Sequence, residues 1–500
     1  MNTRLLGIDV GTGGTRAVLL EADGRVVSAA VADHVAFSSP HPNWAEQDPH
    51  DWWAAACRAI GECLARGGAS PAEIAGIGLT GQMHGLVLLD GQGGVLRPAI
   101  IWCDQRTEQQ ARAITERIGA QRLIELTANP ALTNFTLTKI WWVQQHEPRE
   151  WSATRSILLP KDYLRFRLTG ALATDVTDAS GTLLLDVANR RWSAPMIEAS
   201  RIDSSLLPRL FESHELTGKV SAEAARATGL PAGIPVVAGA GDQAAGAVGL
   251  GIVQAGAVSA TIGTSGVVFA ATSQPTLDPH GRIHTFCHAA PALWHVMGVT
   301  QAAGYSLRWF RDRFAASSAG VSYDELTHEA AAAPPGSDGL LWAPYLMGER
   351  TPHLDPHAKA AFVGITSQHT RAHLIRAILE GVAFSLRDSL TIFSELKIPV
   401  ESIRLGGGGA RSALWREIQA GIYGMAVGTV EAEEGPAYGA ALLAGVGAGV
   451  WPSIEKACQA VIRPSEIIQP NPKHVELLNR CYRNYQQLYP ALRDAMHRAG

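Results

Sequence analysis

Short runs of apolar residues, separated by glycine or charged turns, dominate the first part of the chain. Residues 5–37 contain runs in which apolar and polar positions alternate, as in half-buried β-strands. Residues 49–68, PHDWWAAACRAIGECLARGG, instead space their apolar side chains at helical intervals and end on glycine, which predicts a helix. Strand-like runs return between residues 74 and 102. An antiparallel meander followed by a helix and more strands predicts a mixed α/β sheet.

The second half of the chain shows a related succession of elements. Residues 233–251 predict a buried strand, a glycine turn and a helix of small residues, and residues 104–231 before them are more helical. Four further units follow in chain order. The first is a strand–turn–strand unit, the second a long amphipathic helix, the third a strand with a glycine loop and a helix, and the fourth a short strand with a helix. These elements span residues 257–273, 371–396, 402–424 and 427–449.

Two glycine-threonine turns make the relation between the two halves explicit. DVGTGGT spans residues 9–15 and GTSGV spans residues 263–267, and each lies between strand-like runs. A chain of 500 residues is long enough for about three domains of roughly 150 residues each. We predict two α/β domains of related topology and a helical C-terminal tail. Their boundaries are residues 1–248, 249–450 and 451–500.

Composition disfavours several classes of function. The net charge is −4 and no basic tract occurs, which argues against a nucleic-acid-binding surface. The two long uncharged tracts, residues 243–277 and 435–452, are interrupted by glycine, unlike the roughly 20 apolar residues of a membrane span. Six cysteines are scattered without a C-x-x-C pair, as expected of reduced thiols. We therefore expect a cytoplasmic protein without nucleic-acid or membrane partners, and the sequence leaves open whether it forms a homodimer.

Glycine loops are the strongest chemical signal in the sequence. Glycine lets a backbone approach a ligand closely, so N–H groups and hydroxyls in the loops at 9–15 and 263–267 are able to bind phosphate oxygens. The loop at 406–412 follows a strand and opens a helix, which suits the flat face of an adenosine. The G-x-x-x-x-G-K-[ST] string of P-loop proteins is absent. GAGDQA, at residues 239–244, lacks the acidic residue about twenty positions later that a dinucleotide-binding fold requires. Each loop alone is also compatible with a tight turn, but together they favour a nucleotide site.

A few residues in these loops are candidates for catalysis or binding, each with a structural alternative. Asp242 follows an apparent buried strand and is either a helix N-cap or a general base. Asp9 ends the first strand, where aspartate commonly begins a turn. Met83 and His84, in GQMHG, are residue types that more often stabilise a structure than bind a ligand. Local sequence leaves these alternatives open.

The loops and their order resemble the FGGY family of carbohydrate kinases. The strings that carry the resemblance extend over nearly the whole chain: GIDVGTGGT, PHPNWAEQDPHDWW, GQMHGLVLLD, PAIIWCDQR, LLPKDYLRFRLTG, VVAGAGDQAAGAVG, GTSGVVF, YLMGERTPH, GGGARS and GPAYGAALLAG. Each string alone is weak evidence, whereas their joint occurrence in this order is specific. The resemblance implies an α/β fold of two ribonuclease-H-like domains, of the actin and hexokinase type, with ATP and a sugar in the cleft between them.

The resemblance also implies roles for individual residues. Asp242, within GDQAAG, corresponds to the family's catalytic base, and Asp9 corresponds to the aspartate that helps hold hydrated Mg²⁺ on ATP. The two glycine-threonine hairpins clasp the ATP phosphates from opposite domains, and the third glycine loop lies near the adenosine. The phosphate-facing residues are Thr12, Gly13, Gly14, Thr15, Thr264 and Ser265, and the adenosine-facing residues are Gly407, Gly408 and Arg411.

Within the family, the chain is most similar to members that phosphorylate the ketose D-xylulose. In those members the residues corresponding to Met83 and His84 line the sugar site, and we expect the neighbouring Gln82 and Gln243 to contact the sugar as well. Members that act on glycerol are expected to carry an arginine–glutamate pair in place of Met-His. The expected reaction is ATP-dependent phosphorylation of D-xylulose on its terminal hydroxyl. A kinase for another ketose or a polyol, and an actin-like ATPase or sugar sensor, stay open as alternatives.

Overall fold

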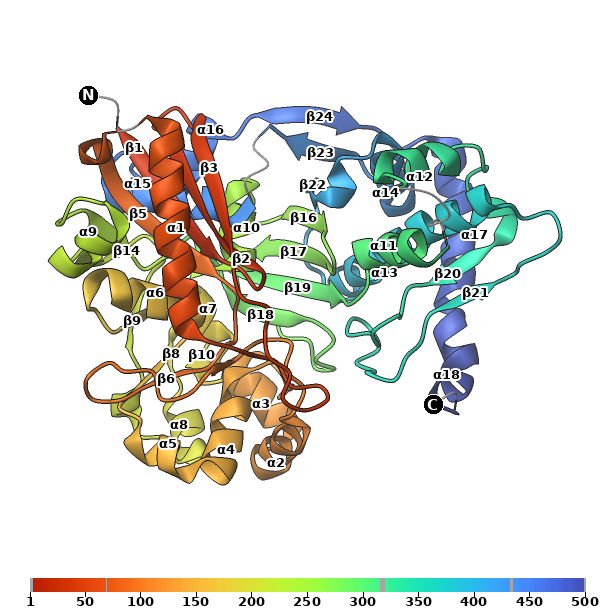
Figure 1. Cartoon of the computed structure of the whole chain (residues 1–500). Coiled ribbons are helices and arrows are strands. Elements are labelled where there is room, and N and C mark those ends of the chain that lie inside the picture. Colours follow the sequence, from red (N-terminus) through yellow and green to blue (C-terminus); the bar gives the residue numbers. More distant parts are fainter. Residues whose placement is uncertain (1–2, 69, 315–319, 432–434, 499–500) are drawn as a thin grey trace.

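Two β-sheets covered by helices form the protein. The computed structural model describes residues 3–68, 70–314, 320–431 and 435–498, and within these ranges each of the two main sheets has seven strands. Figure 1 shows the sheets side by side, with α1 (Pro49–Gly67) crossing the first sheet and the C-terminal helices lying beyond the second. No helix in the described ranges combines the length and apolarity that crossing a bilayer requires.

The first sheet is an antiparallel meander extended by parallel strands. Its strands are β1 (Arg4–Val10), β2 (Gly14–Glu21), β3 (Val26–Asp33), β5 (Ile74–Gly81), β13 (Leu216–Lys219), β14 (Pro235–Val237) and β15 (Ala240–Gly241). β1 pairs antiparallel with β2 and parallel with β5, and both β14 and β15 add to the far side of β5 in parallel. β1 and β5 are almost wholly buried because helices cover both faces of the sheet at these strands.

The second sheet repeats this arrangement. Its strands are β16 (Ala257–Ile262), β17 (Gly266–Thr272), β18 (His284–Cys287), β19 (Trp294–Thr300), β22 (Ser402–Gly407), β23 (Val427–Val430) and β24 (Pro464–Ile468). β16 pairs antiparallel with β17 and parallel with β22, as β1 does with β2 and β5. The duplication inferred from two short glycine-threonine turns therefore extends to whole sheets.

Short strand pairs join the loops around the sheets. They are β4 (Glu46–Gln47) with β7 (Ala99–Ile100), β6 (Val87–Leu89) with β8 (Ser156–Leu158), β9 (Ala173–Asp175) with β12 (Arg209–Phe211), β10 (Leu185–Asp186) with β11 (Arg191–Trp192), and β20 (Leu341–Ala343) with β21 (Ala361–Val363). None of the six cysteines, all of which lie in the described ranges, forms a disulfide.

Helices fill three regions of the molecule. Beside the first sheet and in the lobe below it in Figure 1 lie α2 (Glu108–Ile118), α3 (Ala120–Thr127), α4 (Thr136–His146), α5 (Pro148–Ala153), α6 (Pro160–Thr169), α7 (Val176–Ser180), α8 (Ala194–Ser200) and α9 (Ala222–Thr228). Around the second sheet lie α11 (Gly304–Phe314), α12 (Tyr323–Ala330), α13 (Arg371–Glu395), α14 (Ala413–Tyr423), α17 (Pro472–Gln486) and α18 (Leu488–Arg498). Between the sheets lie α10 (Asp242–Gly249), α15 (Gly435–Gly447) and α16 (Ile454–Val461).

Two features of the C-terminal part differ from the sequence prediction. The helix α15 belongs by chain position to the predicted second domain, yet it packs on β1 and β5 of the first sheet and against α10. The predicted helical tail contains β24, which pairs antiparallel with β23 and ends the second sheet. Its residues Pro464–Ile468 are mostly exposed and show no apolar alternation, so periodicity gave no sign of a strand.

The contact between α10 and α15 is close enough to require glycine at position 439. A Cβ atom there would lie 1.8 Å from the carbonyl oxygen of Ala245 and 3.0 Å from the backbone nitrogen of Gly249. We expect Gly439→Ala to lower the free energy of unfolding by about 3 kcal/mol, because the two backbones must separate. Gly61→Ala, at an exposed position of α1 with no atom within 4 Å of its Cβ, should instead stabilise by about 0.5–1 kcal/mol. Denaturant titrations of both variants test this, and an equal effect at the two positions would contradict it.

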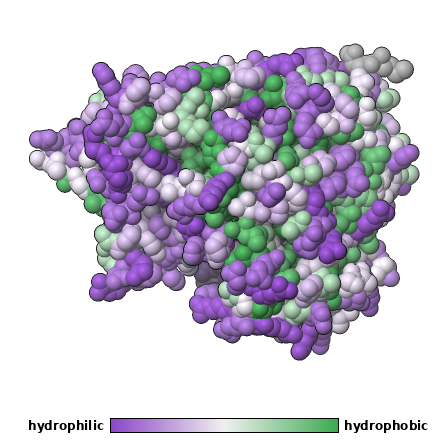
Figure 2. Space-filling view, turned by 180° about the vertical axis from the view of Figure 1, so that it is seen from behind, coloured by the Kyte–Doolittle hydropathy of each residue, from purple (hydrophilic) through white to green (hydrophobic). Residues whose placement is uncertain are grey.

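The outer surface mixes polar and apolar residues. Figure 2 shows hydrophilic residues spread over the face of the molecule seen from behind, with smaller apolar areas between them. A mixed surface of this kind is ordinary for a globular protein, since apolar atoms contribute about half of most protein surfaces. The features that point to function therefore come from the interior cavities.

Candidate active site

Two cavities meet at the third glycine loop. The first has a volume of about 520 Å³ and is lined by the tip of β16 and by residues of α11, α12 and α14. The second, of about 600 Å³, extends from Asp242 along β16, β17 and β22. Gly408 and Arg411 line both cavities. The two cavities are therefore neighbours on either side of the third glycine loop, and Asp242 lines the second.

The first glycine-threonine loop joins β1 to β2 and is fixed from behind by side chains. The backbone N–H of Gly11 donates to Gly14 O at 3.0 Å, which closes the turn. The Thr12 hydroxyl accepts from Trp102 Nε1 at 2.9 Å, and Gln47 Nε2 donates to Thr12 O at 2.7 Å. Gly13, at the tip, is exposed. The loop is therefore held in shape while the backbone of its tip stays accessible.

Thr15 and Gln82 do not occupy the positions that the sequence predicted. Thr15 is fully buried and its hydroxyl lies 2.8 Å from His34 Nε2, so it belongs to the packing of the sheet and does not face a phosphate. Gln82 is 2% exposed, and its amide nitrogen donates to Gln47 Oε1 at 2.9 Å. It also accepts from the Thr12 hydroxyl at 3.3 Å. Gln82 therefore supports the phosphate loop through Thr12 and Gln47.

The second glycine-threonine loop joins β16 to β17. Gly263 N donates to Ser265 O at 2.9 Å, and the N–H groups of Gly304 and Tyr305 donate to the carbonyls of Gly263 and Thr264. Thr264 is exposed and lines the first cavity, whereas Ser265 is partly buried and lines neither of the two cavities. The start of α11 thus holds this hairpin tip in place.

The third glycine loop lies beside the second in space, because β16 and β22 are parallel neighbours with Ile262 paired to Gly407. Gly407 has a φ of 71°, and a Cβ there would lie 2.5 Å from Ile262 O, so no other residue fits without displacement. Gly407, Gly408 and Arg411 are all exposed at the cavities. Ser412 caps α14 by accepting from Trp415 N at 3.3 Å.

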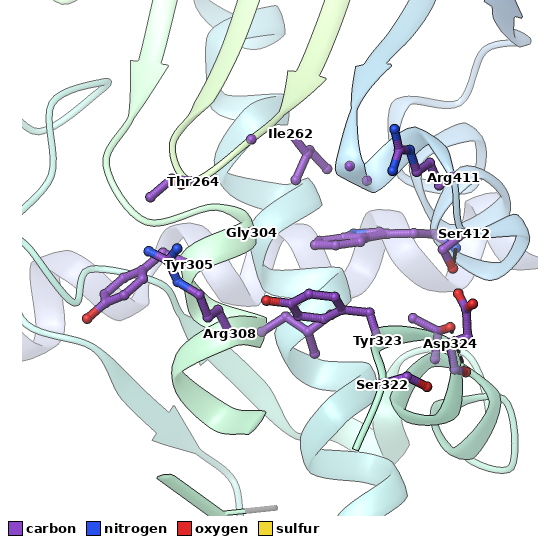
Figure 3. Close-up of a pocket in the computed structure, with 16 residues that line it drawn as sticks. Ile262, Thr264, Gly304, Tyr305, Arg308, Ser322, Tyr323, Asp324, Arg411 and Ser412 are labelled. Carbon is purple, nitrogen blue, oxygen red and sulfur yellow. Dashed lines mark hydrogen bonds between the residues drawn. The ribbon is translucent and has the colours of Figure 1, made fainter. Parts of the chain in front are cut away.

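Figure 3 shows the first cavity from within. Ile262 and Thr264 reach it from the end of β16, Arg308 and Tyr305 from α11, and Tyr323 from the start of α12. Trp415 of α14 lines it as well. Aromatic rings and an arginine around a cavity of this volume suit a flat heteroaromatic group.

Asp242 and Asp9 lie at the same edge of the first sheet. β1 and β15 are both parallel to β5 and on either side of it, so their carboxyl ends meet there. Gly241 is the N-cap of α10 and Asp242 is its first residue, which removes the N-cap interpretation of Asp242. Burial, and then the charge of Asp9, raise the pKa of Asp242 to about 7. A carboxyl group with a pKa near neutrality is suited to accept a proton.

Asp9 presents an unsatisfied buried oxygen. Its Oδ1 is buried without a hydrogen-bond partner, so the side chain does not form the turn that the sequence left open. Burial raises its pKa to about 6, although Arg16 opposes the shift. No group of three or more histidine, cysteine, aspartate or glutamate residues in the described part of the chain is arranged to hold a metal. A single carboxylate oxygen of this kind fits hydrated Mg²⁺, which keeps most of its waters.

His84 and Met83 lie between the base and the helical lobe. His84 has a φ of 68°, and its Nδ1 lies 2.8 Å from Gly181 O. Burial lowers the pKa of His84 well below its usual range. The ring is therefore neutral, and because Nδ1 donates to a carbonyl, Nε2 is an acceptor. Met83 is 5% exposed and packs against the backbone of Gly241, where a Cβ would lie 2.9 Å from its Sδ.

Sequence reasoning missed the residues that support the site. Gln47 and Trp102 fix the first loop, and Arg308, Tyr323 and Trp415 line the first cavity. Gln47 and Trp102 fall within strings that carry the family resemblance, NWAEQDPHDWW and PAIIWCDQR, but no spacing in either string signals a contact with Thr12. Gln243, predicted to touch the sugar, lines the second cavity beside Asp242.

Comparison with known proteins shows the family of the chain. Models of the N-terminal and C-terminal domains of the FGGY family of carbohydrate kinases match residues 4–249 and 258–448. Xylulose kinase from Escherichia coli is 42% identical over 495 residues, covering 97% of this chain and 99% of that protein. Xylulose kinase from Bacillus subtilis is 38% identical over 490 residues, covering 98% and 97%. The structure of xylulose kinase from Rhodospirillum rubrum matches with a TM-score of 0.91 at 32% identity, over 99% of this chain and 100% of that one. The chain therefore belongs to the FGGY family of carbohydrate kinases, and the expected two-domain α/β fold of the actin and hexokinase type is confirmed.

Proposed function

We propose that the protein transfers the γ-phosphoryl group of ATP to the terminal hydroxyl of D-xylulose, giving D-xylulose 5-phosphate and ADP. Curated relatives of 38–42% identity over nearly the full chain are named xylulose kinases, which supports this substrate. The observation that carries the proposal is the position of Asp242, which lines a cavity shared with the third glycine loop and directly follows Gly241, whose backbone packs against Met83.

Asp242 acts as the general base in this proposal. Its carboxylate accepts the proton of the sugar's terminal hydroxyl, whose oxygen attacks the γ-phosphorus as ADP leaves in line. The backbone N–H groups of Thr12, Gly13 and Gly14, with Thr264 of the second loop, bind the phosphate oxygens from the two sheets. No covalent intermediate on the protein is needed, because the acceptor oxygen attacks the phosphorus directly.

Asp9 holds the cation that accompanies ATP. A Mg²⁺ ion bound with ATP would supply positive charge beside the phosphate oxygens. The unpartnered Asp9 Oδ1 is the protein atom that receives the hydrated ion. With a cation there, the negative charge of Asp9 acts less strongly on Asp242.

The sugar is held by His84, Met83 and Gln243. The neutral His84 ring uses its Nε2 to accept a hydrogen bond from a sugar hydroxyl, since Nδ1 faces Gly181 O. Met83 supplies an apolar contact to the carbon chain, and Gln243 offers amide groups beside the base. The adenosine occupies the first cavity, between Arg411 and the residues of α11 and α12 in Figure 3.

The substrate assignment is tested by ADP release with Mg–ATP across D-xylulose, D-ribulose, L-xylulose, sugar alcohols and glycerol. We expect D-xylulose to give the largest kcat/KM. If another ketose or a polyol gives the largest kcat/KM, the assignment as a kinase stands and D-xylulose is not the substrate. ADP release that is independent of any sugar would favour an ATPase.

A substitution at His84 tests its proposed role in binding the sugar. His84→Ala removes the proposed acceptor, and we expect kcat/KM for the sugar to fall about 10–100-fold while KM for ATP changes little, as for loss of one hydrogen bond to a substrate hydroxyl. Steady-state kinetics with each substrate varied in turn measure this. A similar rise in both KM values would mean that the substitution disturbs the fold of the cleft and not a sugar contact.

A further inference from the structure

The short helix α7 (Val176–Ser180) connects the base to the sugar-binding histidine. At its first turn, the Thr177 hydroxyl accepts from the backbone N–H of Gly241 at 2.9 Å, directly before Asp242 in the chain. Just past its end, Gly181 O lies 2.8 Å from His84 Nδ1. One rigid helical turn therefore touches the segments that carry both groups.

Thr177 is itself fixed by a buried carboxylate. Its hydroxyl donates to Asp175 Oδ2 at 2.5 Å, and its backbone N–H donates to the same oxygen at 2.7 Å. The hydroxyl thus accepts one hydrogen bond and donates another, which leaves it a single orientation. Thr177 and Asp175 are both fully buried, so no water competes for these bonds.

A buried group of charged residues anchors Asp175. Lys161 Nζ lies 2.8 Å from Asp175 Oδ1 and 2.6 Å from Asp162 Oδ1. Arg165 pairs with Asp162, and its Nη1 donates to Ala238 O at 2.6 Å, on the same segment that leads to the base. Burial opposes the charge of Lys161, but its carboxylate neighbours raise its pKa above the usual range, so the cation is present at every working pH. Lys161 therefore keeps its ion pair with Asp175.

The helix also meets the second sheet. The Ser180 hydroxyl accepts from the backbone N–H of Cys287 in β18 at 3.0 Å. α7 therefore has fixed contacts to the base segment, to the sugar-binding histidine and to the domain that carries the second phosphate loop.

We propose that α7 is a positioning element for the reaction, and that Thr177 is the residue through which it sets the base. This inference rests on the proposed role of Asp242. The Gly241 N–H fixes where α10 begins, and a displacement of the carboxylate by about 1 Å is enough to lower the rate about 10²-fold. Thr177 touches no substrate; it acts through Gly241 on Asp242.

Thr177→Val keeps the shape of the side chain and removes the hydroxyl. We expect kcat to fall about 10–100-fold with KM for the sugar within about twofold of wild type, since the sugar contacts are unchanged. Thr177→Ser restores the hydroxyl and should keep kcat within about threefold. Thr228→Val is the matched control: Thr228 is 3% exposed and its hydroxyl donates to Ala224 O at 2.7 Å and accepts from Leu230 N at 3.3 Å, in α9, outside both cavities.

The kcat values of the three variants decide whether Thr177 positions the base. A kcat loss in Thr177→Val with rescue by Thr177→Ser and no loss in Thr228→Val supports the inference. Unchanged kcat in Thr177→Val, or an equal loss in Thr228→Val, overturns it. If circular dichroism shows that Thr177→Val does not fold, Thr177→Ala is used in its place, and we expect the same fall in kcat. All variants are assayed with whichever sugar the wild type phosphorylates fastest, so failure of the D-xylulose assignment leaves this test intact.

Discussion

Replacing Asp242 with asparagine is expected to lower kcat for sugar phosphorylation by about 10²–10⁴-fold, the usual contribution of a general base. Asparagine has nearly the shape of aspartate but does not accept the sugar's proton at neutral pH. The binding of both substrates should persist, because Thr12, Thr264 and His84 are untouched. Coupled ADP release at saturating sugar and Mg–ATP measures the change.

The same variant should not be less stable. Burial and Asp9 raise the folded-state pKa of Asp242 to about 7, whereas an unfolded aspartate has a pKa of about 3.9. The folded protein therefore binds this proton more tightly, and ionising the group costs stability as pH rises from about 4 to about 7. Asparagine removes that cost, so thermal unfolding at pH 8 should occur at the same temperature or higher. Full activity in Asp242→Asn, or loss of folding, would contradict the role assigned to this residue.

The raised pKa also predicts the pH dependence of the wild-type enzyme. The base is active only when ionised, so kcat/KM for the sugar should rise about tenfold per pH unit below the pKa of Asp242 and level off above it. That pKa is about 7 when Asp9 is charged, and the cation of Mg–ATP lowers it by offsetting Asp9. Rates measured between pH 5.5 and 8.5 at fixed Mg–ATP test this. A rate that is flat over the whole range down to about pH 5.5 would mean that no group with a pKa near neutrality takes the proton.

Replacing Asp9 with asparagine is expected to have the second largest effect. We expect kcat/KM for Mg–ATP to fall about 10²–10³-fold, comparable to removing one preorganised electrostatic contact to the reacting group. The half-saturating Mg²⁺ concentration should rise as well, because asparagine lacks the charge that attracts the ion. A titration of activity with Mg²⁺ at constant ATP measures both quantities.

A matched control separates the role of Asp9 from a general loss of negative charge. Asp33 lies at the end of β3, two strands away from β1, and is exposed. Asp33→Asn should leave the Mg²⁺ titration unchanged. If Asp9→Asn lowers the rate without moving the half-saturating Mg²⁺ concentration, Asp9 acts on Asp242 or on the fold and does not hold the ion.

Local patterns in the sequence were enough to predict the strands and helices around the glycine loops. Alternation and helical spacing are properties of one segment, and they marked β1, β2, α1, β16, β17 and α13. The relation of the two halves was also visible, because the glycine-threonine turns at 9–15 and 263–267 are local features.

What escaped prediction depends on contacts between distant segments. Asp9 and Asp242 meet because β1 and β15 both pair with β5, and no property of either segment reveals this. The packing of α15 on the first sheet is of the same kind. Thr15 and Gln82 were assigned from their place in a motif, but the alternation along β2 turns Thr15 inward and the contacts of Gln82 lead to the back of the loop.

The central claim is that the protein transfers the γ-phosphoryl group of ATP to the oxygen on carbon five of D-xylulose. Its most direct test is phosphorus NMR of the products formed from D-xylulose and Mg–ATP, with ADP measured in the same sample. The account predicts one sugar phosphate, esterified at carbon five, in equal amount to ADP. A phosphate ester at another carbon, or ADP accompanied by inorganic phosphate alone, would contradict it.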